Sequence, residues 1–375
     1  MEKHLHIISL NVPYPADYGG VYDLFYKLPA LQQQGVLIHL HCFDYGRGEQ
    51  PELNKYCTEV FYYSRNTSSK LLLGNMPYIV ASRKNEKLFQ RLLNDKYPLL
   101  MEGIHCTALA CDNRFAERKK FVRLHNVEYE YYNKLFKTSG NIVKKLYYWR
   151  ECSQLKHYEK ALMNRITAFW PVTQKDKETY SASGCNHIEY LPLFIPPWRA
   201  KQTSGFGSYC LYHGNLEIEE NELAAKWLLS KVFSKTEIPL VIAGKNPSAA
   251  LTALAKKHQH ICIVANPSEG EMNDMVSKAH VHILPSFNST GIKIKLLNAL
   301  FNGRHCLVNH AMADQTGVEE LCHFADNPDA FLQRIEQLYH QPFTVQETEM
   351  RKKVLHKIFD NTANAAQMVK WIWGS

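Results

Sequence analysis

Short apolar runs alternate with longer stretches of helical periodicity along most of the chain. The runs have the length of buried strands, and an alternation of this kind predicts parallel sheets covered by helices. The predicted strands of the first half are residues 5–10, 37–43, 60–63, 99–101, 121–124, 168–171 and 188–191. Those of the second half are residues 209–213, 239–243, 261–264, 280–284 and 305–308.

A break in this pattern at residues 193–207 predicts a domain boundary. The stretch holds two prolines and two glycines, which cannot continue a helix or a central strand. A chain of 375 residues suits two domains of about 150 to 200 residues. We expect an α/β fold of two Rossmann-like doubly wound domains facing a central cleft. The first would comprise residues 1–195 and the C-terminal helix 355–375, and the second residues 205–345.

Composition favours a folded cytoplasmic protein. Hydrophobic residues make up 45% and charged residues 21%, which gives no sign of disorder. We find no secretory signal and no apolar run of the roughly 18 to 20 residues that a membrane-spanning helix needs. The ten cysteines are scattered without a Cys-x-x-Cys pair, which argues against a zinc site and a disulfide framework. We expect reduced thiols and no metal site.

The net charge of +8 points to an anionic partner, and its excess is local. Residues 116–160 hold eleven Lys and Arg against five Glu, interleaved with tyrosines and Trp149. Such a mixture is typical of a basic helix that meets lipid headgroups, which would make the protein peripheral on the inner membrane face. A solvated helix face is the alternative. No nucleic-acid motif is present, and we expect no nucleic-acid partner.

In the first domain, polar residues follow three predicted strands. Gly19 and Gly20 precede a helical stretch, where backbone N–H groups could approach a phosphate or a sugar, or simply form a tight turn. Residues 102–105 and 125–128 each contain a glutamate and a histidine that could bind sugar hydroxyls or move a proton. For the second pair the alternative is a helix N-cap at Asn126 with an acidic first turn.

The second domain contains a more specific pattern. A glycine-containing loop at residues 285–292 leads into a helix with Lys293 and Lys295 in its first turn. Cations there oppose the helix dipole, and a bound diphosphate would remove the conflict. Two solvated lysines are the alternative. Further candidates for binding a donor are Gly214, Asn215, Lys245, Thr290, Gly291 and Asn298.

These motifs resemble the GT-B glycosyltransferases, in particular the retaining family 4 group, also called glycosyl transferases group 1. The resemblance runs through residues 13–20, 125–128, 213–221, 285–303 and 324–331. It implies that the glycine loop, Lys293 and Lys295 lie at the donor diphosphate, and that an acidic residue at the position of Asn298 holds the ribose. It also places Gly19 and Gly20 near the donor phosphates and the acceptor, and His125 at the transferred sugar.

The chain departs from the family pattern at two places. The two glutamates that many members carry eight positions apart are replaced by Thr290 and Asn298. The Arg and Lys that follow the first strand of the second domain are replaced by Asn215 and Asn221. Lys245, Lys293 and Lys295 would then have to neutralise the diphosphate.

The sequence therefore predicts a metal-independent glycosyltransferase without a cofactor. It would move a sugar from a nucleotide-diphosphate sugar to a glycan or lipid-linked acceptor, with retention, in bacterial surface polysaccharide or lipopolysaccharide synthesis. His125, Glu102 and Glu128 are the catalytic candidates. A sugar-nucleotide epimerase of the same fold and a degenerate sugar-nucleotide-binding protein are the alternatives.

Overall fold

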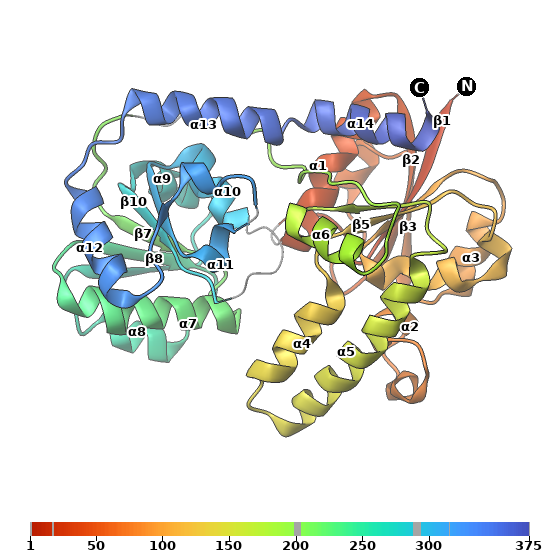
Figure 1. Cartoon of the computed structure of the whole chain (residues 1–375), viewed down its shortest axis with the longest axis horizontal. Coiled ribbons are helices and arrows are strands. Elements are labelled where there is room, and N and C mark those ends of the chain that lie inside the picture. Colours follow the sequence, from red (N-terminus) through yellow and green to blue (C-terminus); the bar gives the residue numbers. More distant parts are fainter. Residues whose placement is uncertain (1, 17–18, 199–203, 288–293, 315, 375) are drawn as a thin grey trace. The chain divides into compact units, whose positions relative to one another are not determined.

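The computed structural model describes residues 2–16, 19–198, 204–287, 294–314 and 316–374. The chain divides into two compact units, each built around one six-stranded sheet (Figure 1). The first unit comprises Met1–Pro196 and Phe359–Ser375, and the second comprises Pro197–Ile358. All strand pairings within the two sheets are parallel, as the alternating pattern predicted.

The sheet of the first unit has the strand order β3-β2-β1-β4-β5-β6. The strands are β1 (Lys3–Ser9), β2 (Val36–Asp44), β3 (Glu59–Ser64), β4 (Leu99–Glu102), β5 (Lys120–Leu124) and β6 (Ala168–Pro171). The helices are α1 (Gly19–Gln33), α2 (Tyr78–Ala81), α3 (Glu86–Leu92), α4 (Glu128–Thr138), α5 (Ile142–Leu162), α6 (Gln174–Ala182) and α14 (Asn361–Trp373). The helices α4 and α5 pack against each other as a hairpin (Figure 1).

The strand predicted at residues 188–191 is wrong. This segment runs beside β6 and forms one isolated bridge, between Ile188 and Phe169, together with a further backbone hydrogen bond from Leu191 to Pro171. Its last backbone carbonyl instead accepts a hydrogen bond from the buried side chain of Arg123, with 2.6 Å between Nη1 and the oxygen of Leu191. A second bridge would need Pro171 of β6 to donate to the carbonyl of Glu189, and proline has no N–H.

The sheet of the second unit has the order β12-β11-β10-β7-β8-β9. Its strands are β7 (Cys210–His213), β8 (Leu240–Gly244), β9 (Ile261–Ala265), β10 (Val281–Leu284), β11 (His305–Val308) and β12 (His323–Phe324). The helices are α7 (Glu219–Trp227), α8 (Ala249–Ala255), α9 (Glu269–Lys278), α10 (Ile294–Asn302), α11 (His310–Ala313), α12 (Pro328–Tyr339) and α13 (Val345–Ile358). All five strands predicted for this half are present, and the two-residue edge strand β12 is an addition to them.

The helical tail of the chain is shared between the units. The helix α13 belongs to the second unit, where Arg351 donates a hydrogen bond to the carbonyl oxygen of Gly303 at 2.8 Å. Asp360 caps the next helix, α14, which packs on α1 in the first unit. The tail predicted as one helix at residues 355–375 is therefore divided between Ile358 and Phe359. Within the described residues, no helix is both long and apolar enough to cross a bilayer.

Candidate functional site

The strand order of each sheet locates the place where a ligand would bind. In both units the chain first forms the strands of one half of the sheet and then those of the other half. The two halves meet between β1 and β4 in the first unit and between β7 and β10 in the second. Ligands of open α/β sheets bind outside the carboxyl ends of the strands at such a switch point. The predicted site residues that the structure describes lie at or after strand ends or in the first two turns of helices.

Glu102 and His125 are brought together at the carboxyl edge of the first sheet. Glu102 ends β4 and is buried, and His125 follows β5. The Nε2 atom of His125 lies 3.0 Å from Oε2 of Glu102. Since a carboxylate accepts, this nitrogen is the donor, and the Nδ1 atom of a neutral ring is left as an acceptor for a sugar hydroxyl.

Two buried cations, Lys27 and Arg123, neutralise the acidic side chains at this edge. The Nζ atom of Lys27 lies 2.6 Å from Oε1 of Glu102 and 2.9 Å from Oδ2 of Asp23. Arg123 holds both oxygens of Asp23 at 2.8 Å. Burial alone would raise the pKa values of the two acids, but the neighbouring cations outweigh it and both pKa values are lowered. Asp23, Glu102 and His125 place ligand atoms within 4.8 Å of one another, yet the ammonium of Lys27 already supplies the cation between the two carboxylates.

Sequence analysis missed Asp23, Lys27 and Arg123. The sequence does carry a signal for them, which is a charged residue inside an otherwise apolar stretch. Asp23 and Lys27 are one helical turn apart in α1, and Arg123 lies within β5. All three side chains are fully buried. Buried charges of this kind are almost always paired.

Glu128 lies in a different cluster from Glu102 and His125. It is the buried first residue of α4, and its Oε1 atom lies 3.9 Å from Nδ1 of His105. Burial, together with the nearby carboxylate of Glu159, raises the pKa of Glu128 to about 8. Glu128 is therefore mostly protonated at neutral pH and can donate a hydrogen bond. An N-cap at Asn126 is wrong, because the N-cap residue of α4 is Val127.

Gly19 and Gly20 are the first two residues of α1. Their position at a helix start agrees with both interpretations of the pair, a ligand-binding backbone and a tight turn. The two residues before them lie outside the described part of the chain.

Lys295 is held at the carboxyl edge of the second sheet by neutral groups. It is the second residue of α10, and its Nζ atom lies 2.9 Å from the amide oxygen of Asn221 and 3.4 Å from the hydroxyl of Tyr212. The amide nitrogen of Asn221 in turn donates to the backbone carbonyl of Asn215 at 2.9 Å. A lysine, two asparagines and a tyrosine thus form one connected group beside the loop after β7.

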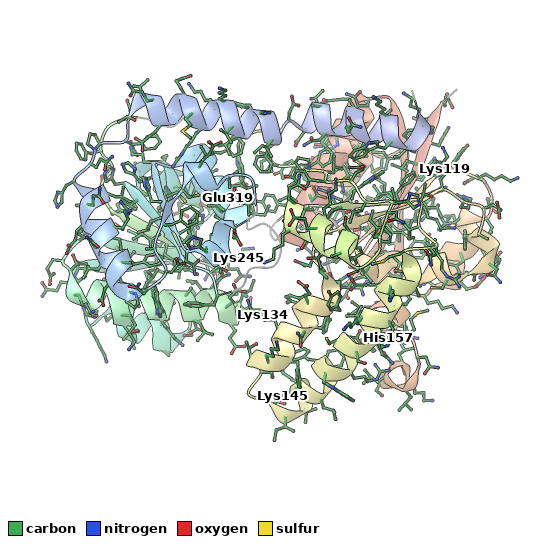
Figure 2. The ribbon with its side chains drawn as sticks, viewed as in Figure 1. Lys119, Lys134, Lys145, His157, Lys245 and Glu319 are labelled. Carbon is green, nitrogen blue, oxygen red and sulfur yellow. The ribbon has the colours of Figure 1, made fainter. Side chains whose placement is uncertain are left out.

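The backbones after β7 and β8 approach each other closely. A Cβ atom added to Gly244 would lie 1.8 Å from the carbonyl oxygen of Gly214, which no side chain could tolerate. A Cβ atom on Gly214 would lie 3.4 Å from the side chain of Asn221. Lys245 follows directly at an exposed position, labelled in Figure 2. The two glycines therefore let the loop beneath Lys245 pack against the Asn221 group.

The glycine loop itself is described only in part. Thr290, Gly291 and Lys293 lie outside the described residues. The amide oxygen of Asn298 accepts a hydrogen bond from Asn302 at 2.8 Å, one turn later in α10. The amide nitrogen of Asn298 is thus the group that could meet a ribose hydroxyl.

His213 is a further residue that was not selected as a site candidate, although it opens the motif at residues 213–221. It ends β7 and is buried, and neither ring nitrogen has a hydrogen-bond partner within the described residues. Burial lowers its pKa to about 3, and the nearby charge of Lys295 acts in the same direction. The ring is therefore neutral and offers both a donor and an acceptor next to the Gly214 loop.

Comparison with known proteins gives a family match and a sequence relative. Residues 207–341 match the family described as Glycosyl transferases group 1. An uncharacterized 44.6 kDa protein in the cps region of Klebsiella pneumoniae is 26% identical over 332 residues, which cover 83% of this chain and 84% of that protein.

Solved structures share the fold of the whole chain. HepE from Anabaena, in complex with UDP and glucose, has a TM-score of 0.65 at 10% identity and is covered completely, as is this chain. TarM has a TM-score of 0.71 at 8% identity, with 100% of this chain and 99% of that chain covered. The α/β fold and the resemblance to GT-B glycosyltransferases are confirmed.

Proposed function

We propose, from the premise that residues 207–341 form a glycosyl transferases group 1 domain, that the chain transfers a sugar from a nucleotide-diphosphate sugar to a glycan or lipid-linked acceptor. The transfer would proceed with retention and without a metal ion. The observation that carries the proposal is Lys295, a cation held by Asn221 at the carboxyl edge of the domain that matches the family. HepE, whose fold this chain shares, has been solved with UDP-glucose, and a TarM variant with UDP and α-GlcNAc-glycerol.

The second unit would bind the donor. The amide of Asn221 and the phenol of Tyr212 position the ammonium of Lys295, which would stabilise the diphosphate as it leaves. Lys245, Lys293 and the loop at Gly291 would add charge and backbone N–H groups. Gly214 and Asn215 would line the same edge, with the amide of Asn298 at the ribose.

The first unit would position the sugar and the acceptor. Because Glu102 fixes the ring of His125, the Nδ1 atom can accept a hydrogen bond from a sugar hydroxyl. Glu102 itself already accepts from Lys27, so we assign it a positioning role and not that of a base. Glu128, protonated at neutral pH, would act as a donor in its own cluster with His105.

The donor assignment is tested by measuring the thermal shift of the full chain with UDP-, GDP- and ADP-sugars. One class should raise the unfolding temperature. Lys295→Ala should weaken the binding of that donor roughly ten- to hundredfold, since a hydrogen bond to a charged group contributes about 1.5 to 3 kcal/mol. Lys278→Ala is the matched control, because Lys278 is an exposed lysine of the same unit paired with Asp274. Equal affinities in the two variants would contradict the proposal.

Product analysis separates transfer from its alternatives. With a membrane fraction that carries lipid-linked glycans, a glycosyltransferase releases nucleoside diphosphate, whereas without acceptor the donor stays intact. An epimerase would convert the sugar without any acceptor. A degenerate protein would show the thermal shift and neither product, as the replacement of both family glutamates by Thr290 and Asn298 would allow.

The acceptor would be presented at an anionic membrane surface by the hairpin of α4 and α5. Four large apolar side chains are exposed near the start of α5: Ile142, Val143, Leu146 and Trp149, with exposures from 85% at Ile142 to 56% at Trp149. Ile142, Leu146 and Trp149 recur at the spacing of one helix face. Lysines flank them, among them Lys134 and Lys145 in Figure 2. Each cation near an anionic surface contributes ~1 kcal/mol. Surface polysaccharide synthesis agrees with the cps region in which the Klebsiella relative is found.

Sedimentation with vesicles of anionic and neutral lipids tests the membrane assignment. The protein should sediment with anionic vesicles at low salt and be released by salt. Ile142→Asp with Leu146→Asp should abolish sedimentation. Ile218→Asp with Leu223→Asp, two exposed apolar residues of the second unit, should leave it intact. Binding that is absent, or that both pairs reduce equally, would overturn the assignment.

A further inference from the structure

Three potential metal ligands meet at the amino edge of the second sheet. His305 is the first residue of β11, His323 is the first residue of β12, and Glu347 stands in the first turn of α13. One ligand atom from each lies within 4.8 Å of the other two. Because all strands of this sheet are parallel, the group lies at the opposite end of the sheet from Gly214 and the Asn221 group.

The hydrogen bonds of His305 define its tautomer. Its Nε2 atom lies 3.0 Å from the carbonyl oxygen of Gln341, and a carbonyl can only accept, so Nε2 carries the proton. In the neutral ring, Nδ1 therefore presents a lone pair. That lone pair is 3.6 Å from the Oε1 atom of Glu347 and 3.3 Å from the Nε2 atom of His323. A lone pair facing a carboxylate is unfavourable, and a donor between the three side chains relieves the conflict, either the Nε2–H of His323 or a cation.

Protonation of the ring would also relieve this conflict, and burial opposes it. The side chain of His305 is fully buried, where an imidazolium would lose its hydration. A neutral imidazole is the form that binds a metal.

The distances fit a tetrahedral ion. Zinc lies about 2.0 to 2.1 Å from imidazole nitrogens and carboxylate oxygens, which separates neighbouring ligand atoms by about 3.3 Å. The observed separations from His305 are 3.3 Å to His323 and 3.6 Å to Glu347, and the separation between His323 and Glu347 is within 4.8 Å. Two imidazoles and one carboxylate are also a donor set that suits zinc.

The atoms around the ligands hold them in place. The Oε2 atom of Glu347 accepts from the backbone N–H and the hydroxyl of Thr344, both at 2.8 Å, which leaves Oε1 toward His305. The Nε2–H of His305 is fixed by Gln341, the outer contact that metal-binding histidines commonly make. Arg351 is the opposing charge, and its guanidinium is engaged by the carbonyl of Gly303 and the ring of Phe343. Glu347 is 30% exposed, which gives an ion access.

We propose that His305, His323 and Glu347 bind a zinc ion, with water as the fourth ligand, that fastens the start of α13 to the edge strands β11 and β12. The site is structural and separate from the proposed transfer of sugar, so either proposal can fail without the other. It departs from the sequence-based expectation of no metal site, because the ligands are 18 and 24 residues apart and form no compact motif.

Calorimetric titration of the chelator-treated full chain with zinc chloride tests the site. We expect one ion per chain and a rise in the unfolding temperature. His323→Gln and Glu347→Gln should each weaken binding at least tenfold. The second variant keeps the helix cap, because glutamine can also accept from Thr344. His310→Gln is the control, since His310 forms an exposed pair with Asp326 in the same unit.

Cobalt substitution identifies the donor atoms. Cys306 and Cys322 each adjoin one of the two histidines, and a thiolate would give an intense ligand-to-metal charge-transfer band in the near ultraviolet. Visible bands of tetrahedral cobalt without that band, lost in His323→Gln, would support the proposal. A thiolate band, no saturable binding, or equal affinity in all three variants would overturn it.

Discussion

The carboxyl edges of the two sheets hold their charged side chains in different ways. In the first unit, Lys27 and Arg123 are buried against Asp23 and Glu102, so two cations and two anions cancel inside the protein. In the second unit, Lys295 is held by an amide and a phenol. A network of buried ion pairs fixes geometry, whereas a lysine held by an amide and a phenol lies beside the loops of the strand ends. In the proposed function, the first unit would orient the sugar and the second would bind the diphosphate.

The largest effect is expected where the cancelled network is broken. Lys27→Met would leave Asp23 and Glu102 buried with one cation fewer, and removing one partner of a buried ion pair costs about 3 to 5 kcal/mol. Urea denaturation should show this loss in the free energy of unfolding. Lys278→Met breaks an exposed pair and should leave the urea midpoint unchanged. A small effect of Lys27→Met would mean that the network does not hold the first unit together.

A smaller effect is expected where the second edge relies on close backbone contact. Gly244→Ala would force a methyl group against the carbonyl of Gly214, and overpacking of this kind costs about 1 to 3 kcal/mol. Donor affinity should fall as well, because the loop beside Asn221 must shift. Gly270→Ala is the control, since a Cβ atom at Gly270 in α9 would meet no other atom within 4 Å. Equal unfolding curves for the two variants would refute the close-contact role.

A third effect, measured as a change with pH, concerns a part of the first unit where charge is not cancelled. Burial raises the pKa values of Glu128 and Glu159 to about 8, compared with the ordinary value of 4.5. Between these values the folded state binds more protons than the unfolded chain, so the free energy of unfolding falls as pH rises from about 5 to 8. Glu128→Gln should reduce this slope in urea denaturation at several pH values. Glu117→Gln, at an exposed position, should keep it, and an unchanged slope in Glu128→Gln would exclude burial as its cause.

Most of the fold could be predicted from the sequence, because the buried strands of parallel sheets are apolar runs that can be recognised without knowing their neighbouring strands. Sequence-based prediction failed at residues 188–191, where pairing with β6 stops after one bridge because Pro171 has no N–H to donate. It also gave no sign of the two-residue strand β12, which exists only because β11 lies beside it.

The candidate site was predictable where a motif is local. Glu102 and His125 follow neighbouring strands and do meet. The network behind them was not predictable, because Asp23 and Arg123 are 100 residues apart and only the folded sheet joins them. The residue type at position 298 does not show which of its atoms would take the place of the family glutamate. In the structure the amide oxygen of Asn298 already accepts a hydrogen bond from Asn302. The assignments of Thr290, Gly291 and Lys293 remain predictions.

The position of α14 has a consequence for the folding of the protein during its synthesis on the ribosome. Leu24, Leu28 and Leu31 of α1 pack against Met368 and Ile372 of α14, in one core cluster. The first unit is thus the first to be synthesised and the last to be completed, since its core needs a helix that follows the entire second unit. During translation the apolar face of α1 stays uncovered until α14 has been synthesised. The second unit is a continuous stretch from Pro197 to Ile358, so all of its residues are available before then. A nascent chain of this design would depend on chaperones for its first half more than for its second.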